Sequence, residues 1–225
     1  ENYGRTDPET GLSSRLVDFL DTLDELVDYA IDEKIDLALF CGDAYKSRDP
    51  SQTHQREFAR RIARLTSENI PVFLLLGNHD IPHVTNRATA LDIFPTLEVK
   101  NIYIGNSLTT YKIPTKSGPV QIVALPWIRR SEFLSRQDTY KLTPDEINET
   151  IQSRLSDAIS VEASQLDPGM VSIFSGHVSV GDAKTGSEQW MTLGKDHHLL
   201  KSSVALPQFD YVALGHIHRH QILGR

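Results

Sequence analysis

The first long stretch of the chain places apolar and acidic residues with the period of a helix. Over residues 12–33, apolar side chains recur every three or four positions, and aspartates and glutamates fill the opposite side. This pattern predicts an amphipathic helix with one face against a core. Residues 51–69 show the same period. A capping box at Thr143 and Glu146 predicts a further helix that ends near Gln165.

Short, wholly apolar runs separate these helical stretches. Residues 36–40 and 71–76 are predicted to be buried strands on either side of the second helix, which together make a parallel βαβ unit with a right-handed crossover. Because both runs are apolar throughout, we expect both faces of their sheet to be covered. Three more short strands are predicted at 102–104, 108–113 and 120–125, and there we expect antiparallel pairing.

The last third of the chain adds two apolar strands, at 170–175 and 210–214. The connection between them, residues 177–211, contains several glycines and shows no clear periodicity, which is typical of a functional loop or wall. No repeat or linker divides the chain. The sequence therefore predicts one mixed α/β domain that contains two sheets.

Composition narrows the class of protein. The 225 residues include 23 Lys and Arg against 30 Asp and Glu, a net charge of −7, which disfavours nucleic-acid binding through bulk charge. Bound cations or a local basic patch would escape this count. The single cysteine, Cys41, excludes an internal disulfide and a cysteine-clustered zinc site, and it fits a reducing cytoplasm. No apolar run approaches the roughly 18–20 residues that span a bilayer, so we expect no membrane segment.

Four of the apolar strands end in the same way, with a glycine followed by a residue that can bind a metal. The carboxyl ends of strands in an α/β sheet line one crevice, and glycine permits a sharp turn and a close approach, so these side chains are expected to converge. His218 is a fifth candidate, because residues two apart in an extended segment point the same way. The four pairs are Gly42-Asp43, Gly77-Asn78, Gly176-His177 and Gly215-His216.

The five candidates mix carboxylate and amide oxygens with imidazole nitrogens. This mixture suits manganese, iron or zinc better than calcium or a structural zinc ion. An aspartate can bridge two ions, and two ions about 3.5–4 Å apart are a common device for phosphoester hydrolysis. Each residue alone also fits an ordinary role as a turn former or a solvated histidine, but that alternative is weak for five residues that follow one pattern.

These residues carry a resemblance to the calcineurin-like metallophosphoesterases. The resemblance covers nearly the whole chain and implies a two-sheet α/β/β/α sandwich of the metallophosphoesterase type. Residues 211–219, Leu125-Pro126-Trp127 and Gly186-Ser187-Glu188 are similar to one branch, the SbcD-type nucleases that process DNA breaks in bacteria. The motifs similar to those of the family are Gly42-Asp43, Gly77-Asn78-His79-Asp80, Ser175-Gly176-His177 and Gly215-His216-Ile217-His218.

The resemblance implies a role for each matched metal ligand. Asp43 would bridge two divalent metal ions, most suitably Mn²⁺. Asn78, His177 and His216 would hold one of these ions. His218 would belong to the other.

Residues beside the ligands receive roles of their own. His79 would be catalytic, because the resemblance implies that it contacts the scissile phosphate and assists the leaving oxygen. Asp80 is expected to hold its loop, since short acidic side chains favour turns. Lys46 and Arg48 are candidates for phosphate contact. A basic stripe on the second helix favours a solvated face over a phosphate contact: Arg56, Arg60 and Arg64.

The expected activity is manganese-dependent hydrolysis of DNA phosphodiesters by a hydroxide that bridges two metal ions. The enzyme would be a hydrolase acting on ester bonds, an exonuclease or endodeoxyribonuclease. It would serve DNA repair and recombination as the SbcD component of an SbcCD-like complex. The implied partners are DNA and an SbcC-like ATPase subunit, with a homodimer left open, in the cytoplasm. Two alternatives stay open: a metallophosphoesterase that acts on nucleotides or phosphoproteins, and a non-catalytic scaffold subunit.

One motif of the family has no counterpart at the expected place. The family opens with Asp-x-His on its first strand, and no such triplet precedes Gly42-Asp43. We therefore expect residues 1–225 to be a nuclease domain truncated at both ends. The first strand with its two ligands, the cap and the ATPase-binding region would be absent. The five remaining ligands are expected to bind at least one metal ion weakly.

Overall fold

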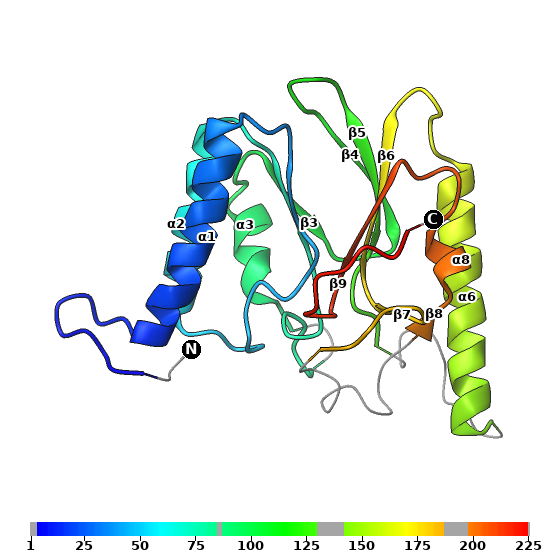
Figure 1. The fold of residues 1–225 in the computed structure, drawn as a ribbon, viewed down its shortest axis with the longest axis horizontal. Helices are drawn as coiled ribbons and strands as arrows, with labels where there is room; N and C mark the ends of the chain where they lie inside the picture. Colours follow the sequence, from blue (N-terminus) through cyan, green and yellow to red (C-terminus); the bar gives the residue numbers. More distant parts are fainter. Residues whose placement is uncertain (1–3, 85–86, 130–141, 187–197, 225) are drawn as a thin grey trace.

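The computed structural model describes residues 4–84, 87–129, 142–186 and 198–224 of the chain. Two β-sheets lie face to face, and helices cover the outer side of each, so that the layers follow the order α/β/β/α (Figure 1). This arrangement confirms the predicted fold class. None of the helices in the described ranges has the length and apolar character that crossing a bilayer requires.

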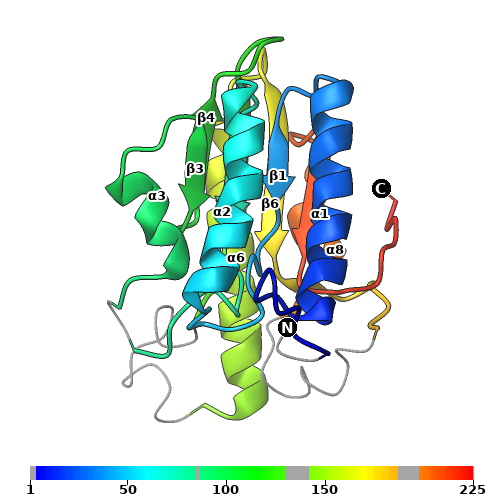
Figure 2. The ribbon, with the colours of Figure 1, turned by 90° about the vertical axis from the view of Figure 1, so that its left-hand side faces the viewer.

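The first sheet and its helices come from the N-terminal half of the chain (Figure 2). Its strands are parallel and lie in the order β1 (Ala38–Phe40), β2 (Val72–Leu75) and β3 (Ile102–Gly105). The helices of this half are α1 (Ser14–Asp32), α2 (Gln52–Ser67), the short helix η1 (Ala90–Asp92) and α3 (Ile93–Thr96).

The second sheet comes from the remainder of the chain. Its strands lie in the order β4 (Thr109–Ile113), β5 (Val120–Leu125), β6 (Val171–His177) and β9 (Tyr211–Gly215). The long helix α6 (Pro144–Ser164) and the short helix α8 (Lys201–Val204) cover its outer face (Figure 1). A separate strand pair is formed by β7 (Ser179–Val180) and β8 (His198–Leu199).

Serine and threonine side chains define where the long helices begin. The hydroxyl oxygens of Ser13 and Ser51 accept backbone hydrogen bonds at the starts of α1 and α2. At α6 the predicted capping box is present, because Thr143 accepts from the backbone N–H of Glu146, and the Glu146 carboxylate accepts from that of Thr143. The three long helices were therefore predictable to within a few residues.

Alternation along β2 explains why a strand can be apolar at every position. Leu74 faces the helices and joins the core formed with α1 and α2, while Phe73 and Leu75 face the other sheet. Ile122 of β5 meets them in the core between the sheets. Its neighbour Val123 faces α6 and belongs to a third core. Three cores thus hold the four layers together, and both sheets are covered on both faces.

Two features of the middle of the chain differ from the prediction. β4 and β5 are antiparallel, as expected, but β3 joins the first sheet and pairs in parallel with β2. Short helices η1 and α3 were not predicted, although Thr89 and Asp92 form a capping box there. The 177–211 connection also contains structure, in β7, β8 and α8.

Candidate metal centre

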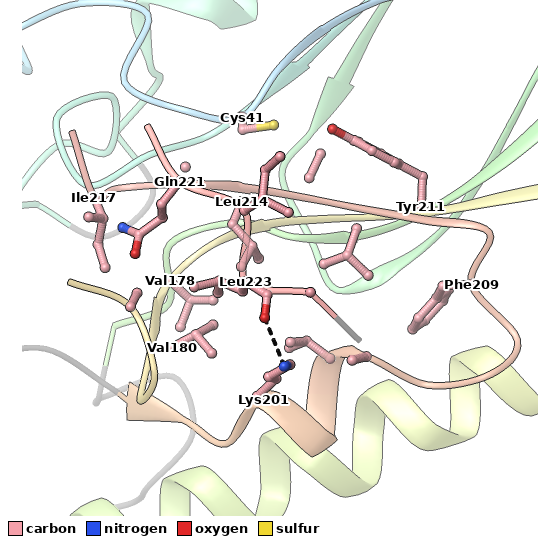
Figure 3. A pocket seen from close by; sticks show the side chains of 18 of the residues that line it. Cys41, Val178, Val180, Lys201, Phe209, Tyr211, Leu214, Ile217, Gln221 and Leu223 are labelled. Carbon is pink, nitrogen blue, oxygen red and sulfur yellow. Dashed lines mark hydrogen bonds between the residues drawn. The ribbon is translucent and has the colours of Figure 1, made fainter. Parts of the chain in front are cut away.

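A cavity of about 890 Å³ runs along β9 and the chain that follows it (Figure 3). Its lining is mostly apolar and includes Leu214, and at one end it reaches Cys41 and Gly215. Lys201 closes another side by donating a hydrogen bond from Nζ to the carbonyl oxygen of Leu223, at 2.8 Å. The strand-end ligand candidates do not line this cavity but lie beside it, since His216 directly follows Gly215.

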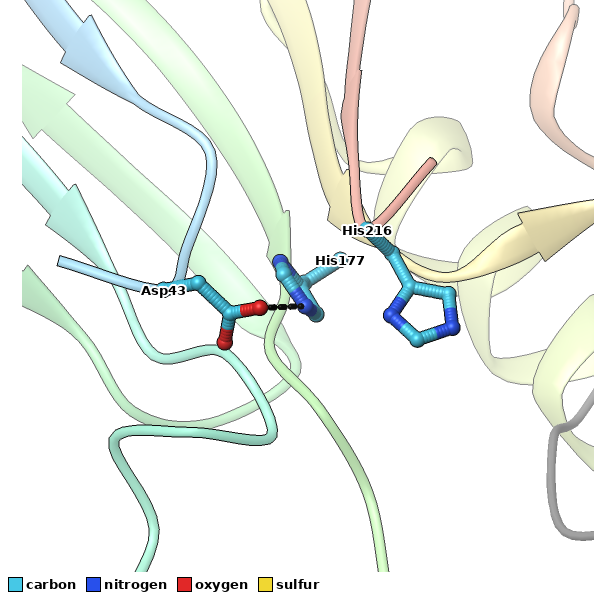
Figure 4. Close-up of side chains that lie close together, drawn as sticks. All are labelled: Asp43, His177 and His216. Carbon is cyan, nitrogen blue, oxygen red and sulfur yellow. Dashed lines mark ion pairs between the residues drawn. The ribbon is translucent and has the colours of Figure 1, made fainter. Parts of the chain in front are cut away.

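Four strand ends from the two sheets meet next to this cavity. Asp43 and Asn78 follow β1 and β2 of the first sheet, whereas His177 ends β6 and His216 follows β9 in the second sheet. One ligand atom each of Asp43, His177 and His216 lies within 4.8 Å of the other two, which is close enough for a shared ion (Figure 4). The structure thus brings these side chains together, as the repeated strand-glycine pattern predicts.

Asn78 lies between the two histidines. Its Oδ1 is 3.0 Å from Nε2 of His177 and 3.2 Å from Nδ1 of His216. Oδ2 of Asp43 is 3.4 Å from the same Nε2 of His177. Both histidines are buried, with His177 only 1% exposed, so bulk water competes little for these groups.

A hydrogen bond behind His177 determines which of its nitrogens faces the centre. Nδ1 lies 2.7 Å from the carbonyl oxygen of Cys41, and because a carbonyl oxygen only accepts, Nδ1 carries the hydrogen and donates it. In the neutral ring, Nε2 then turns a lone pair toward the oxygens of Asn78 and Asp43. Several electron pairs that meet in a buried place need a proton or a cation between them. This donor set therefore fits a divalent transition metal.

Asp43 is kept in the ionised form that binds metals. Burial acts to raise the pKa of its carboxyl group, but hydrogen bonding with His177 and with the backbone N–H of His79 outweighs burial. The His79 N–H donates to Oδ1 of Asp43 at 2.9 Å. As a result the pKa of Asp43 lies below its ordinary value of 3.8.

The glycines before Asp43 and Asn78 leave room for the other ligands. A Cβ atom on Gly42 would overlap the ring of His177, and a Cβ atom on Gly77 would overlap the carboxylate and backbone nitrogen of Asp43. Gly42 also has a φ of 96°, which favours glycine. The close approach expected from the sequence is therefore part of the packing.

Two of the clustered residues have a left-handed backbone. The φ angle is 55° at Asp43 and 80° at His216. Lys34, Asn69 and Glu98 also have positive φ, but each follows the C-terminal cap of a helix, where such residues are common. No helix ends at position 43 or 216. Their unfavourable backbone conformations are thus associated with the site itself.

Asp80 joins the two loops of the first sheet. Its carboxylate is 3% exposed and accepts hydrogen bonds from the backbone N–H groups of Gly77 at 2.9 Å and of Ala44 and Tyr45 at 3.3 Å each. Burial raises the pKa of Asp80 and the nearby charge of Asp43 adds to the effect, while the backbone donors oppose it. The prediction that Asp80 holds its loop is confirmed.

Comparison with known proteins agrees with this geometry. The family model described as calcineurin-like phosphoesterase matches residues 16–220. The chain belongs to the calcineurin-like phosphoesterase family. It is also similar to the SbcD subunit of the nuclease SbcCD from Staphylococcus epidermidis, with 31% identity over 188 residues. These residues make up 83% of this chain and 47% of that relative, so the chain spans about half the length of the curated protein it matches. The resemblance to SbcD-type metallophosphoesterases is therefore confirmed.

In this calcineurin-like phosphoesterase, His218 lies outside the group formed by Asp43, His177 and His216, and it is exposed. The sequence argument assumed an extended backbone from 216 to 218. However, β9 ends at Gly215, and the positive φ of His216 turns the chain. Assignment of His218 to a second metal ion stays a prediction.

His79 lies in the turn that follows Asn78 and is partly exposed. Its backbone binds Asp43, as described above, and its catalytic role stays a prediction. Two other sequence features fall outside the described residues. These are Ser187-Glu188 of the branch motif and the first two residues of an Asp-x-His triplet, Asp196-His197-His198. That triplet is distant from the N-terminal position expected for the family motif.

Trp127 is at the site, although the sequence analysis gave it no role there. The centroid of its indole ring lies 5.0 Å from that of the His216 imidazole and 6.3 Å from that of His177. Its backbone N–H donates to the carbonyl oxygen of Leu76 at 2.8 Å. One signal was available in the sequence, because Trp127 follows the end of the buried strand β5 just as the ligands follow theirs.

Arg48 is anchored to the loop that leads away from the centre. Its Nε donates to the carbonyl oxygen of Ile81 at 2.9 Å, and its Nη1 lies 3.2 Å from Nε2 of His83. Neither partner is acidic, so its positive charge is not neutralised by these contacts. Arg48 therefore keeps the character of a phosphate contact.

The basic stripe on α2 is paired with acidic side chains instead. Arg56 and Arg60 contact the buried carboxylate of Glu57 at 2.8 Å and 2.9 Å. Arg64 reaches across to Asp24 of α1 at 2.8 Å. These pairs hold α2 against α1 and favour the interpretation as a helix face over that as a phosphate contact.

Proposed function

We propose that this protein is a metal-dependent DNA nuclease that hydrolyses phosphodiester bonds, as the SbcD component of an SbcCD-like complex in DNA repair and recombination. The observation that carries the proposal is the cluster of Asp43, Asn78, His177 and His216 in a calcineurin-like phosphoesterase. Membership of the family supports a hydrolase acting on ester bonds. Similarity to a relative named as a nuclease subunit supports DNA as the substrate, an SbcC-like ATPase as the partner and the cytoplasm as the location.

The proposal includes two divalent metal ions, most suitably Mn²⁺. Asp43 bridges the two ions, Asn78, His177 and His216 hold one of them, and His218 belongs to the other. When bound, such ions lower the pKa of water and neutralise charge that develops at phosphorus. The buried hydrogen bond from His177 to the Cys41 carbonyl fixes the ring so that Nε2 faces the ion.

His79 acts on the substrate in this proposal. The backbone N–H of His79 is held by Asp43, while its partly exposed side chain stays within reach of a phosphodiester. A hydrogen bond from this imidazole stabilises the leaving oxygen and supplies a proton to it. We further propose that residues 1–225 form the nuclease domain of a longer protein, whose other parts complete the second metal site and bind the ATPase and DNA.

A comparison of two substrates tests the proposal. The complete protein is incubated with Mn²⁺ and either linear DNA or a small chromogenic phosphodiester. Hydrolysis of both supports the nuclease, whereas hydrolysis of the small substrate alone favours an enzyme that acts on nucleotides or phosphoproteins. Binding of Mn²⁺ without hydrolysis of either substrate favours the scaffold subunit.

Three substitutions connect the activity to the proposed residues. Asp43→Asn is expected to abolish Mn²⁺ binding and activity together. His79→Asn is expected to lower kcat by about 10²–10⁴-fold with Mn²⁺ binding unchanged, because this range is typical of a general acid. His54→Asn is the control, since the ring of His54 contacts Ser51 at the start of α2 and lies outside the ligand cluster.

A further inference from the structure

The candidate metal centre is divided between two separate sheets. Asp43 and Asn78 belong to loops of the first sheet, and His177 and His216 belong to the second. No strand pairing joins the first sheet to the second among the described residues. Metal affinity depends on how well the ligands are placed before the ion arrives, so the contacts that hold the two halves together affect binding.

Trp127 contacts both halves of the centre. It follows β5 of the second sheet, yet its backbone N–H donates to Leu76, one residue before the Gly77-Asn78 turn of the first sheet. Its indole ring meanwhile packs against the imidazole ligands from β6 and β9, tilted by 39° to the ring of His216 and by 77° to that of His177. One residue thus contacts the loop that carries Asn78 and also both histidines.

We propose that Trp127 is a positioning residue that aligns the two halves of the metal centre and fixes the planes of both imidazole ligands. This inference rests on the proposed function. A large, rigid indole restricts the rotation of the rings that it covers, and it also excludes water from one side of the ligands. Because Trp127 has no ligand atom suited to the metal, its effect acts through His177 and His216.

Matched substitutions in the complete protein separate positioning from general packing. Trp127→Phe keeps an aromatic face, whereas Trp127→Leu keeps an apolar side chain without that face. Phe209→Leu is the control, because Phe209 is equally an aromatic partner in a ring pair, with Phe174 at 5.4 Å, but lies in the core beneath α6. Calorimetry gives the Kd for Mn²⁺, and thermal unfolding in chelator gives the stability without metal.

We expect Trp127→Leu to raise the Kd for Mn²⁺ by at least about 10-fold, the usual effect of losing a group that orients metal ligands. Trp127→Phe is expected to stay within about 3-fold of the wild type. Phe209→Leu is expected to lower the unfolding temperature without changing the Kd. Unchanged Mn²⁺ binding in Trp127→Leu, or an equal loss in Phe209→Leu, would overturn the inference.

Fluorescence gives a second readout of the same contact. The chain has two tryptophans, so Trp190→Phe leaves Trp127 as the only emitter. Paramagnetic Mn²⁺ is expected to quench this emission with the midpoint found by calorimetry, and emission that stays constant while Mn²⁺ binds would contradict the contact. If the wild type binds no Mn²⁺, both the proposed metal centre and this inference fail. If it binds Mn²⁺ but leaves DNA intact, only the nuclease assignment fails.

Discussion

Replacement of Asp80 by alanine gives a direct measure of how strongly the two ligand-bearing loops are held. The Asp80 carboxylate accepts three backbone hydrogen bonds, from Gly77 and Ala44 at Oδ2 and from Tyr45 at Oδ1. Alanine would leave all three donors without this acceptor in a buried environment.

The expected cost follows from these contacts. A hydrogen bond to a charged group contributes about 1.5–3 kcal/mol, and the two contacts at 3.3 Å are at the weak end. Removal of a buried carboxylate also relieves a desolvation cost, so a net loss of about 3 kcal/mol is expected. For a chain of this length that corresponds to roughly 6–12 °C in the unfolding temperature.

Asp80→Asn is the matched variant. Its single amide oxygen replaces one carboxylate oxygen but not both, so about half of the loss is expected. Both variants are unfolded by heat in chelator and then titrated with Mn²⁺, where weaker binding should follow the same order because the loops of Asp43 and Asn78 separate. An unfolding temperature for Asp80→Ala within about 2 °C of the wild type would refute the reasoning, as would a larger loss in Asp80→Asn.

Three further predictions address charge and close packing. The pKa of Glu57 lies below its ordinary value of 4.5, since burial acts to raise it but hydrogen bonds from neighbouring arginines outweigh burial. A carboxyl group with a lowered pKa adds stability that is present above pH about 4.5 and is lost as the pH falls through its folded-state pKa. Glu57→Gln should therefore show a shallower acid-unfolding curve than the wild type, and equal curves would contradict this. Arg48→Ala should reduce the slope of log K for DNA against log salt by about 0.9 and leave cleavage of a small phosphodiester unchanged, with Arg15→Ala as the control; an unchanged slope would remove Arg48 from the interface. Gly77→Ala should abolish Mn²⁺ binding because its Cβ overlaps an aspartate ligand, whereas Gly181→Ala, which meets only an ordinary contact at 3.8 Å, should bind Mn²⁺ normally.

Local patterns in the sequence predicted most of the elements but not all of their partners. The three long helices followed from apolar periodicity and cap residues, which act within one or two turns of chain. Pairing of β3 with β2 was not predictable in this way, because strands 102–105 and 109–113 are both short and apolar and their partners are distant in sequence. The brief helices η1 and α3 contain too few residues to establish a period.

The candidate site shows the same division between local and distant information. Convergence of Asp43, Asn78, His177 and His216 was predictable because each follows a glycine at the carboxyl end of a buried strand. His218 was misplaced by the alternation argument, since nothing in the sequence reveals that φ is positive at His216. Trp127 was missed because its ring contacts exist only where β5, β6 and β9 end beside the first sheet.

The left-handed backbones at Asp43 and His216 set thermal robustness against catalytic competence. Glycine in either place would remove a conformational cost of about 1–2 kcal/mol, of which its own greater freedom in the unfolded chain cancels about half. The resulting variants would survive heating slightly better while lacking a proposed ligand. A selection for heat tolerance alone would therefore be expected to accumulate inactive proteins altered at these two positions, and an engineering campaign would need to keep both fixed.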